Sequence, residues 1–288
     1  MTNPPENIIV EARDVIIVEA RNVSFSYPEE PDRYVLNNLN LQVCRGECVA
    51  ILGESGAGKT TLLKLLCGLL KPTHGQILFK GKPLQGPEND IALIFQNYGL
   101  FPWKTVRENI LLPARLRKKR VDENELGKLL DYLGLREYAR RFPAELSGGQ
   151  LQRTALGRAV MSRASLLLMD EPFSALDLRN RMRLQSFMKT FLEDTGMTSV
   201  IVTHSVEEAL CMGDRVAVFD PETGRIRKTW DGCRQETDPD PAVLDERGRR
   251  IRESLLQMQQ TGLSYGEEPD NACARKNSGM VGKREEPQ

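Results

Sequence analysis

The residues with the clearest chemical potential lie in a glycine-rich stretch, residues 53–60, which fits the pattern G-x-x-x-x-G-K-[ST]. Its glycines allow backbone N–H groups to curl around phosphate oxygens without a Cβ in the way, and a following helix adds positive potential at its N-terminus. Lys59 can neutralise β- and γ-phosphates, and Thr60 can ligate Mg²⁺. A site for a phosphate-bearing ligand is therefore favoured over a glycine-rich turn with a solvated lysine. Its residues are Gly53, Glu54, Ser55, Gly56, Ala57, Gly58, Lys59 and Thr60.

Two carboxylates, Asp170 and Glu171, directly follow the apolar run of residues 166–169. A buried strand that ends in this way places both side chains at its C-terminal tip, where ligands bind in open α/β sheets. Asp170 would hold Mg²⁺ through water, and Glu171 would orient or deprotonate an attacking water. Alone, the pair would more often mark the charged N-terminus of a helix, but the phosphate-binding stretch reverses that preference.

A third stretch, residues 145–153, combines a helix cap with two glycines. Ser147 can cap a helix with Gln150 reaching back to it, and Gly148 and Gly149 leave backbone amides bare for an anion. A plain capped helix is the alternative. The run Leu-Ser-Gly-Gly-Gln over residues 146–150 resembles the signature of the nucleotide-binding subunits of ATP-binding cassette (ABC) transporters, and it lies between the two phosphate motifs in the order typical of that family.

The resemblance covers roughly residues 19–230 and implies roles for further residues. Tyr27 would stack on the adenine of ATP, although a core tyrosine is about as common. Gln96 would sense Mg²⁺ and the attacking water, and His204 would contact the γ-phosphate, although a lone Gln or His is usually structural. Residues 174–177 match the loop that crosses between subunits, so that Asp177 joins the nucleotide site; helix capping at Ser174 is an alternative compatible with that role. Thr61 belongs to the expected nucleotide site as well.

The apolar runs at residues 48–52, 166–169 and 199–203 predict buried strands, and the leucines of residues 60–70 predict a buried helix. Residues 75–82 predict a strand and turn. Residues 105–165 are predicted to be mostly helical, with one helix capped by Asp122 and Glu125. Strands that alternate with helices indicate an α/β fold with a mostly parallel sheet. The resemblance implies a P-loop NTPase with a RecA-like core, an antiparallel β-subdomain and an inserted α-helical subdomain over about residues 100–165.

The chain is expected to divide into four parts. Residues 1–18 form an N-terminal extension, and residues 19–231 form the ATP-binding domain. A short repeat spans the first boundary, since residues 8–13 recur as residues 16–21, and the second copy is expected to enter the main sheet. Residues 232–260 form a C-terminal helical appendage. Residues 261–288 contain too few apolar side chains to offset their ordering entropy, so disorder is expected there.

Composition narrows the possible partners. The chain has 40 basic and 40 acidic residues, which gives a formal net charge of +0 and argues against a chain-wide field for nucleic acid. No run approaches the 18 apolar residues that would indicate a membrane span. The resemblance implies a head-to-tail homodimer that binds ATP and Mg²⁺ and works with transmembrane permease subunits. It places the dimer peripherally on the cytoplasmic face of the cell membrane, with a periplasmic or extracellular substrate-binding protein as an indirect partner.

Residues 99–110 resemble those of importers for nitrate, sulfonates, taurine and related small anions. Phe101 and Trp103 could anchor a membrane subunit, with core packing about equally expected. The chief alternative function is a soluble, non-transport ABC ATPase. A P-loop kinase or GTPase would not need residues 146–150, and no guanine-reading N-K-x-D occurs. Intact Lys59, Asp170, Glu171 and His204 argue against a non-catalytic subunit.

Overall fold

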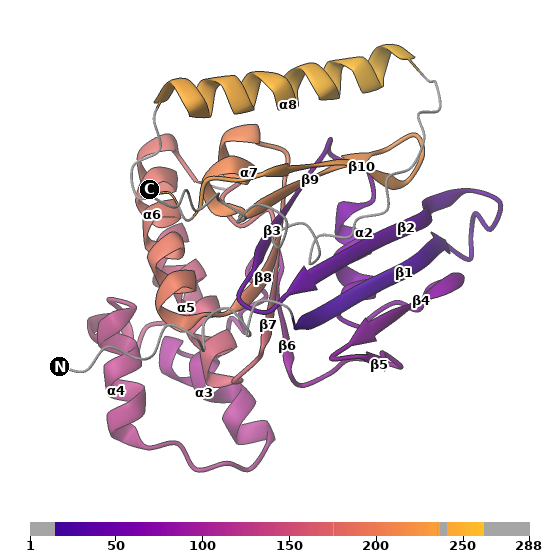
Figure 1. The fold of residues 1–288 in the computed structure, drawn as a ribbon. Helices are drawn as coiled ribbons and strands as arrows, with labels where there is room; N and C mark the ends of the chain where they lie inside the picture. The colour runs from indigo at the N-terminus through magenta and orange to yellow at the C-terminus, as the bar shows by residue number, and fades with distance from the viewer. Residues whose placement is uncertain (1–14, 175, 235, 237–240, 262–288) are drawn as a thin grey trace, which may run out of the picture.

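The computed structural model describes residues 15–174, 176–234, 236 and 241–261, which form two β-sheets, an inserted group of helices and a C-terminal helix (Figure 1). The first copy of the repeat, Ala175 and the tail from residue 262 lie outside the described residues. The predicted α/β class with a mostly parallel sheet is confirmed.

The larger sheet has the strand order β10-β9-β3-β8-β7-β6, in which every neighbouring pair is parallel except β9 and β10. Its strands are β3 (Cys48–Leu52), β6 (Ile91–Ile94), β7 (Leu166–Asp170), β8 (Thr198–Thr203), β9 (Arg215–Asp220) and β10 (Arg225–Asp231). Strands β3, β7 and β8 are buried along their whole length, as continuous apolar runs predict. Because parallel strands end at one edge, the segments after β3, β6, β7 and β8 meet there.

The smaller sheet is antiparallel, with the order β2-β1-β4-β5. Its strands are β1 (Ile16–Ser26), β2 (Tyr34–Cys44), β4 (His74–Phe79) and β5 (Lys82–Pro83). Strand β1 contains the second copy of the repeat, so the prediction that this copy enters the main sheet is wrong. Apolar alternation predicts a strand but not the sheet that the strand joins, which here is decided by pairing with β2 and β4.

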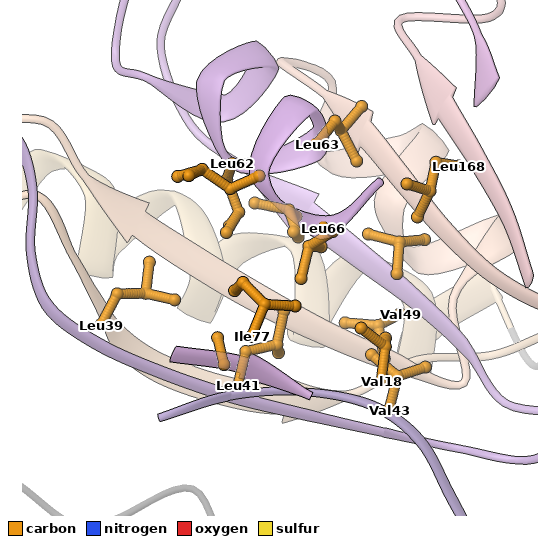
Figure 2. Packing of buried hydrophobic residues seen from close by; sticks show 14 of the residues in the cluster. Val18, Leu39, Leu41, Val43, Val49, Leu62, Leu63, Leu66, Ile77 and Leu168 are labelled. Atoms are coloured by element: carbon orange, nitrogen blue, oxygen red, sulfur yellow. The ribbon is translucent and has the colours of Figure 1, made fainter. Parts of the chain in front are cut away.

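Helix α2 (Lys59–Leu66) is packed between the two sheets (Figure 2). Its leucines at 62, 63 and 66 face Val18, Leu41 and Ile77 on one side and Val49 and Leu168 on the other. The helix ends four residues earlier than predicted, since Gly68 adopts a φ of 75° and a Cβ there would collide with the backbone of Gly86. This packing fixes the N-terminus of α2 against the end of β3.

The opposite face of the larger sheet is covered by α5 (Gly148–Met161) and α6 (Leu178–Thr195). Alternation along β7 divides its residues between the two faces: Leu166 and Leu168 point to the α2 side, whereas Leu167 and Met169 point to the α5 and α6 side. The short helix α7 (Val206–Met212) follows β8 directly.

The inserted helices are α3 (Val106–Leu116), α4 (Glu123–Tyr132), the two 3₁₀ turns η1 (Arg136–Tyr138) and η2 (Pro143–Glu145), and the start of α5. A separate apolar cluster that includes Val106, Leu126 and Leu133 holds them together. Asp122 caps α4 as predicted, but Glu125 does not complete the cap, because its carboxylate lies 3.6 Å from the guanidinium of Arg163.

The C-terminal helix α8 (Pro241–Thr261) lies over α7 and the β9–β10 hairpin (Figure 1). Its Ile251 is fully buried against a cluster that includes Val206 and Leu210. Among the described residues, no helix combines the length and apolar character needed to cross a bilayer.

Candidate functional site

The loop between β3 and α2 has the geometry of an anion cradle. Gly56 and Gly58 have φ values of 81° and 103°, and a Cβ on Gly58 would lie 2.7 Å from Val35 Cγ1, so both positions favour glycine. No side chain caps α2, which leaves its first backbone amides available to a ligand. The sequence pattern thus predicted both the loop and the exposed helix terminus correctly.

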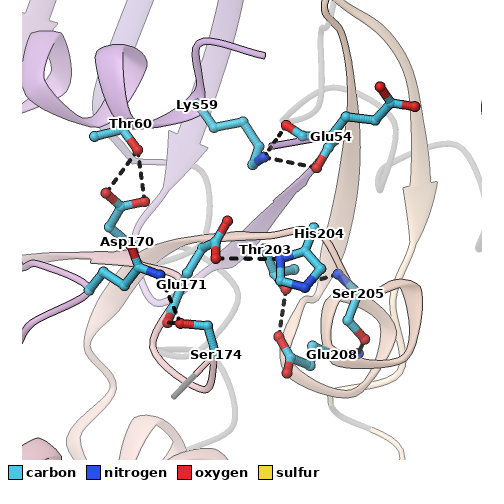
Figure 3. Close-up of polar contacts among 12 residues, drawn as sticks. Glu54, Lys59, Thr60, Asp170, Glu171, Ser174, Thr203, His204, Ser205 and Glu208 are labelled. Atoms are coloured by element: carbon cyan, nitrogen blue, oxygen red, sulfur yellow. Dashed lines mark hydrogen bonds and ion pairs between the residues drawn. The ribbon is translucent and has the colours of Figure 1, made fainter. Parts of the chain in front are cut away.

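Lys59 lies at the centre of this cradle and is only 4% exposed. Its Nζ donates hydrogen bonds to the carbonyl oxygens of Gly53 at 2.8 Å and Glu54 at 2.6 Å (Figure 3). Burial lowers the pKa of the ammonium, and the charges of Glu171, Asp170 and Glu54 oppose that shift. The ammonium is therefore held in place by neutral carbonyls. Because these bonds do not neutralise its positive charge, it can still pair with a bound anion.

Thr60 and Asp170 converge on one point although they lie 110 residues apart. The Thr60 hydroxyl donates to the carboxylate of Asp170, with distances of 2.9 and 3.1 Å to its two oxygens. Burial raises the pKa of Asp170, and the hydrogen bond from Thr60 acts against that shift. A hydroxyl and a carboxylate are hard oxygen donors of the type that Mg²⁺ prefers, so the residues present fit this metal.

Glu171 and His204 lie beside that point (Figure 3), and Gln96 lines the same cavity as Glu171. His204 Nδ1 lies 3.4 Å from Glu171 Oε2. The Ser174 hydroxyl donates to the Glu171 carbonyl at 3.0 Å and accepts a hydrogen bond from Gln96 Nε2 at 3.2 Å. Ser174 therefore does not cap a helix; Asp177 caps α6 instead, by accepting from the N–H of Asn180.

Glu171 has a backbone φ of 45°, which is uncommon for a residue with a Cβ. Three hydrogen bonds hold this conformation: the Glu171 N–H donates to the Val202 carbonyl at 2.9 Å, and the Ser174 hydroxyl and N–H both donate to the Glu171 carbonyl. Non-glycine residues in this region cluster at functional sites. The conformation directs the carboxylate toward His204 at the end of β8.

A cavity of about 650 Å³ joins these groups to the antiparallel sheet. It is lined by Tyr27, Ser55, Gly56, Gly58, Lys59, Thr60, Thr61, Gln96 and Glu171, together with Glu29, Glu30, Arg33 and Val35. Tyr27 is half-buried, and its hydroxyl is 2.9 Å from that of Thr61, which fixes the ring at the cavity wall. That volume suits a nucleotide-sized ligand.

Residues 147–150 do not line this cavity. Ser147 and Gln150 form the predicted capping box, with the Ser147 N–H bonded to Gln150 Oε1 at 2.9 Å. A Cβ on Gly149 would meet nothing within 4 Å, so the backbone there faces open space. Asp177 is exposed and also absent from the lining. Within one chain, then, the predicted site residues fall into two groups.

The sequence interpretation missed three polar residues that hold the loops of the site, of which Asn109 and Glu208 are buried and Arg158 is half-buried. Asn109 on α3 bonds the N–H and carbonyl of Phe101, and Arg158 on α5 donates to the carbonyls of Tyr98 and Gly99. Glu208 on α7 accepts from Thr203 at the end of β8. Each occupies a helix position next to apolar residues. A polar residue at such a position could have indicated a side chain that binds a loop.

Comparison with known proteins agrees with this arrangement. A family model described as ABC transporter matches residues 36–174. A taurine import ATP-binding protein, TauB, of Jannaschia sp. (strain CCS1) is 39% identical over 214 residues, which are 73% of this chain and 80% of the relative. An aliphatic sulfonates import ATP-binding protein, SsuB 2, of Burkholderia cenocepacia (strain HI2424) is 39% identical over 222 residues, 76% of this chain and 82% of the relative.

A solved structure of a dimeric ATP-binding cassette in a post-hydrolysis state, bound to ADP and phosphate, aligns with a TM-score of 0.64 at 31% identity and covers 75% of this chain and 98% of that one. The chain therefore belongs to the ABC transporter family and is an ATP-binding, ATP-hydrolysing subunit. Its P-loop NTPase fold, with an antiparallel β-subdomain and a helical subdomain, is as predicted.

Proposed function

We propose that this chain hydrolyses MgATP to drive the import of a small anion, such as nitrate, a sulfonate or taurine, through separate transmembrane subunits. The observation that carries the proposal is one cavity lined by Lys59, Thr60 and Glu171, with Asp170 hydrogen-bonded to Thr60 at its edge. The substrate class rests on the taurine and sulfonate import relatives at 39% identity. The same relatives favour transport over a soluble, non-transport ATPase.

In this proposal each group in the cavity has one task. Tyr27 stacks on the adenine, the amides of residues 53–61 hold the phosphates, and Lys59 neutralises the β- and γ-phosphates. Mg²⁺, held by Thr60, Asp170 and Gln96, would supply charge neutralisation of the phosphate oxygens. Glu171 accepts a proton from the attacking water, and His204 orients Glu171 and contacts the γ-phosphate.

The chain would act as a head-to-tail homodimer. Residues 147–150 and Asp177 have the character of a nucleotide site but do not line the cavity of their own chain. In a dimer related by a two-fold axis, Ser147 and Gly149 of each chain would close the nucleotide site of the other. The open space over Gly149 leaves room for the partner's phosphate.

Contact with the membrane subunits would occur at the segment after Gln96. Trp103 is 69% exposed, which excludes core packing for its side chain, and its ring meets the edge of Phe101 at 5.4 Å between centroids. An exposed tryptophan on a loop held by buried hydrogen bonds is a typical binding anchor. Through this contact the chain would lie at the cytoplasmic face of the membrane, with a substrate-binding protein on the other side as an indirect partner.

The test is the substitution Glu171→Gln. Because the amide cannot accept the proton, phosphate release should fall by roughly 10²- to 10⁴-fold, the range for loss of a general base. ATP affinity should persist, and the ATP-bound variant should elute from size exclusion as a dimer, since the nucleotide is not consumed. Glu137→Gln makes the same change on an exposed surface and serves as control. Wild-type phosphate release by purified Glu171→Gln would reject the role of Glu171.

A further inference from the structure

A buried carboxylate behind the site has no role in the proposed chemistry. Glu208 lies in the first turn of α7, and only 6% of its side chain is exposed. Its Oε2 accepts a hydrogen bond of 2.5 Å from the Thr203 hydroxyl, and its Oε1 lies 3.6 Å from Arg181 Nε on α6. Figure 3 shows Glu208 below Thr203, on the side away from Lys59. A buried ionisable group with these partners calls for an explanation.

Glu208 is connected to the backbone on both sides of His204. The hydroxyl of Thr203, which precedes the histidine, donates to the Glu208 carboxylate and accepts a hydrogen bond from the Ser205 N–H at 3.1 Å. Ser205, which follows the histidine, accepts the backbone N–H of Glu208 at 3.2 Å. These contacts fix the residues on both sides of His204, whose side chain is half exposed and lies 3.4 Å from Glu171. The position of the Glu208 carboxylate therefore bears on the backbone from which the imidazole extends.

The second partner of Glu208 leads to the loop that contains Ser174 and Asp177. Arg181 Nη2 donates to the carbonyl of Leu176 at 3.1 Å. The Leu176 side chain in turn packs on the start of α5, where a Cβ on Gly148 would lie 2.7 Å from its Cδ2. A continuous set of contacts therefore extends from residues 147–150, through Leu176, Arg181, Glu208 and Thr203, to His204.

Stability alone does not account for this arrangement. Desolvation of two charges costs several kcal/mol per ion, and only close pairing with good hydrogen bonds offsets it. The buried Nε of Arg181 makes no hydrogen bond within the described part of the chain, and its contact with Glu208 is an ion pair at 3.6 Å. The Arg181 side chain is one-third exposed, so the desolvation cost falls mainly on Glu208. Because replacing such an ion pair by apolar residues is often neutral or stabilising, a positional role is favoured.

We propose that Glu208 is a positioning residue that orients His204 through Thr203 and, through Arg181, couples it to the loop at Leu176 and to the turn at Gly148. The proposal rests on the proposed head-to-tail dimer. There His204 serves the nucleotide of its own chain, whereas residues 147–150 serve that of the partner. The contacts would therefore connect the two nucleotide sites within one polypeptide.

The chain offers a direct probe of this coupling, since His74 and His204 are its only histidines. Protein labelled with ¹⁵N in histidine alone gives signals from two side chains, and the exposed His74 can be assigned with a His74→Gln variant. Glu208→Gln, which keeps the size of the side chain, should shift the His204 signals and leave those of His74 unchanged. Arg181→Met should do the same, and Thr203→Val should shift them more than Thr203→Ser, which keeps the hydroxyl.

Kinetics give the second readout. Displacing a catalytic group by as little as an ångström lowers the reaction rate roughly tenfold to a hundredfold. Glu208→Gln should therefore lower kcat by about that factor, while the KM for ATP should change by less than about twofold. If both residues act through one contact, the double variant Glu208→Gln/Arg181→Met should be no slower than the slower single variant. Glu253→Gln and Arg183→Met make matched changes at exposed positions of α8 and α6.

Unchanged His204 signals and unchanged kcat in folded Glu208→Gln would overturn the proposal, as would fully additive losses in the double variant. If Glu208→Gln does not fold, Arg181→Met, at a position whose side chain is one-third exposed, decides by the same two readouts. Failure here is separate from failure of the proposed function, because ATP hydrolysis by the wild type and its loss in Glu171→Gln do not depend on Glu208.

Discussion

At the scale of single residues, the phosphate site contains a desolvated cation, Lys59, that a bound phosphate would stabilise. Burial desolvates the charged forms of Lys59 and Asp170, which lowers the pKa of Lys59 and raises that of Asp170. Lys59 is hydrogen-bonded to carbonyl oxygens rather than to a carboxylate. A phosphate oxygen can therefore pair with the ammonium without first breaking an ion pair.

The residue-scale prediction concerns Lys59→Ala. Loss of a charge-assisted hydrogen bond costs about 1.5–3 kcal/mol, which is at least roughly tenfold in Kd. The loss should be at the upper end of that range, because the phosphates would then lie near Asp170 and Glu171 with Mg²⁺ alone to offset the repulsion. Isothermal titration calorimetry with ATP measures it, and Lys71→Ala, at an exposed position after α2, serves as control. Equal affinity in Lys59→Ala and wild type would contradict the assigned contact.

At the scale of elements, the sequence predicted what each segment becomes more reliably than where it goes. The loop at residues 53–60 and the carboxylates after β7 were predicted from local spacing, since their chemistry depends on neighbours in the chain. The placement of β1 in the antiparallel sheet was not, because strand pairing is a long-range choice. Arg158 was missed for the same reason, because its partners lie 59 and 60 residues away in the chain. Asn109 and Glu208 bond residues within eight positions, and what the sequence did not predict is that they are buried.

The element-scale prediction follows from Asn109, which fixes the segment after Gln96 to α3. Its fully buried amide bonds the N–H of Phe101 and the carbonyls of Phe101, Lys104 and Thr105. Asn109→Leu keeps the volume but leaves the Phe101 N–H and the Lys104 carbonyl unpaired, whereas the carbonyls of Phe101 and Thr105 keep a backbone partner. At about 1–3 kcal/mol for each unpaired group, the free energy of unfolding should fall by at least about 2 kcal/mol. Urea denaturation followed by circular dichroism measures the change.

Asn124→Leu, an equivalent change at an exposed position of α4, should alter stability by less than about 0.5 kcal/mol. Asn109→Leu with the same midpoint as wild type would show that the segment is held by other contacts. A lower midpoint with an unchanged m-value would show a loss of stability without a change in the surface exposed on unfolding.

At the scale of the whole molecule, the chain presents two surfaces that its own fold leaves open. One contains residues 147–150 and Asp177, which match a nucleotide site in sequence but do not line the cavity. The other contains Trp103, on a segment that α3 and α5 hold from two sides through Asn109 and Arg158. Since Gln96 begins that segment and also lines the cavity, a short stretch of chain connects the cavity to Trp103.

The prediction at this scale is that Trp103→Ala weakens attachment to the membrane subunits. A tryptophan anchor is worth about 2 kcal/mol or more at an interface, which is roughly thirtyfold in affinity. Tagged chain purified from detergent-solubilised membranes of cells that produce the whole transporter should therefore recover much less of the transmembrane subunit, as quantified by mass spectrometry. Leu256→Ala removes an apolar side chain of similar exposure from α8, and this variant should recover the transmembrane subunit normally.

Because Trp103 makes few contacts with the core, the thermal midpoint of Trp103→Ala should stay near that of the wild type. A loss of recovery therefore reports on docking rather than on folding. Undiminished recovery with Trp103→Ala would place the membrane contact on another face of the molecule.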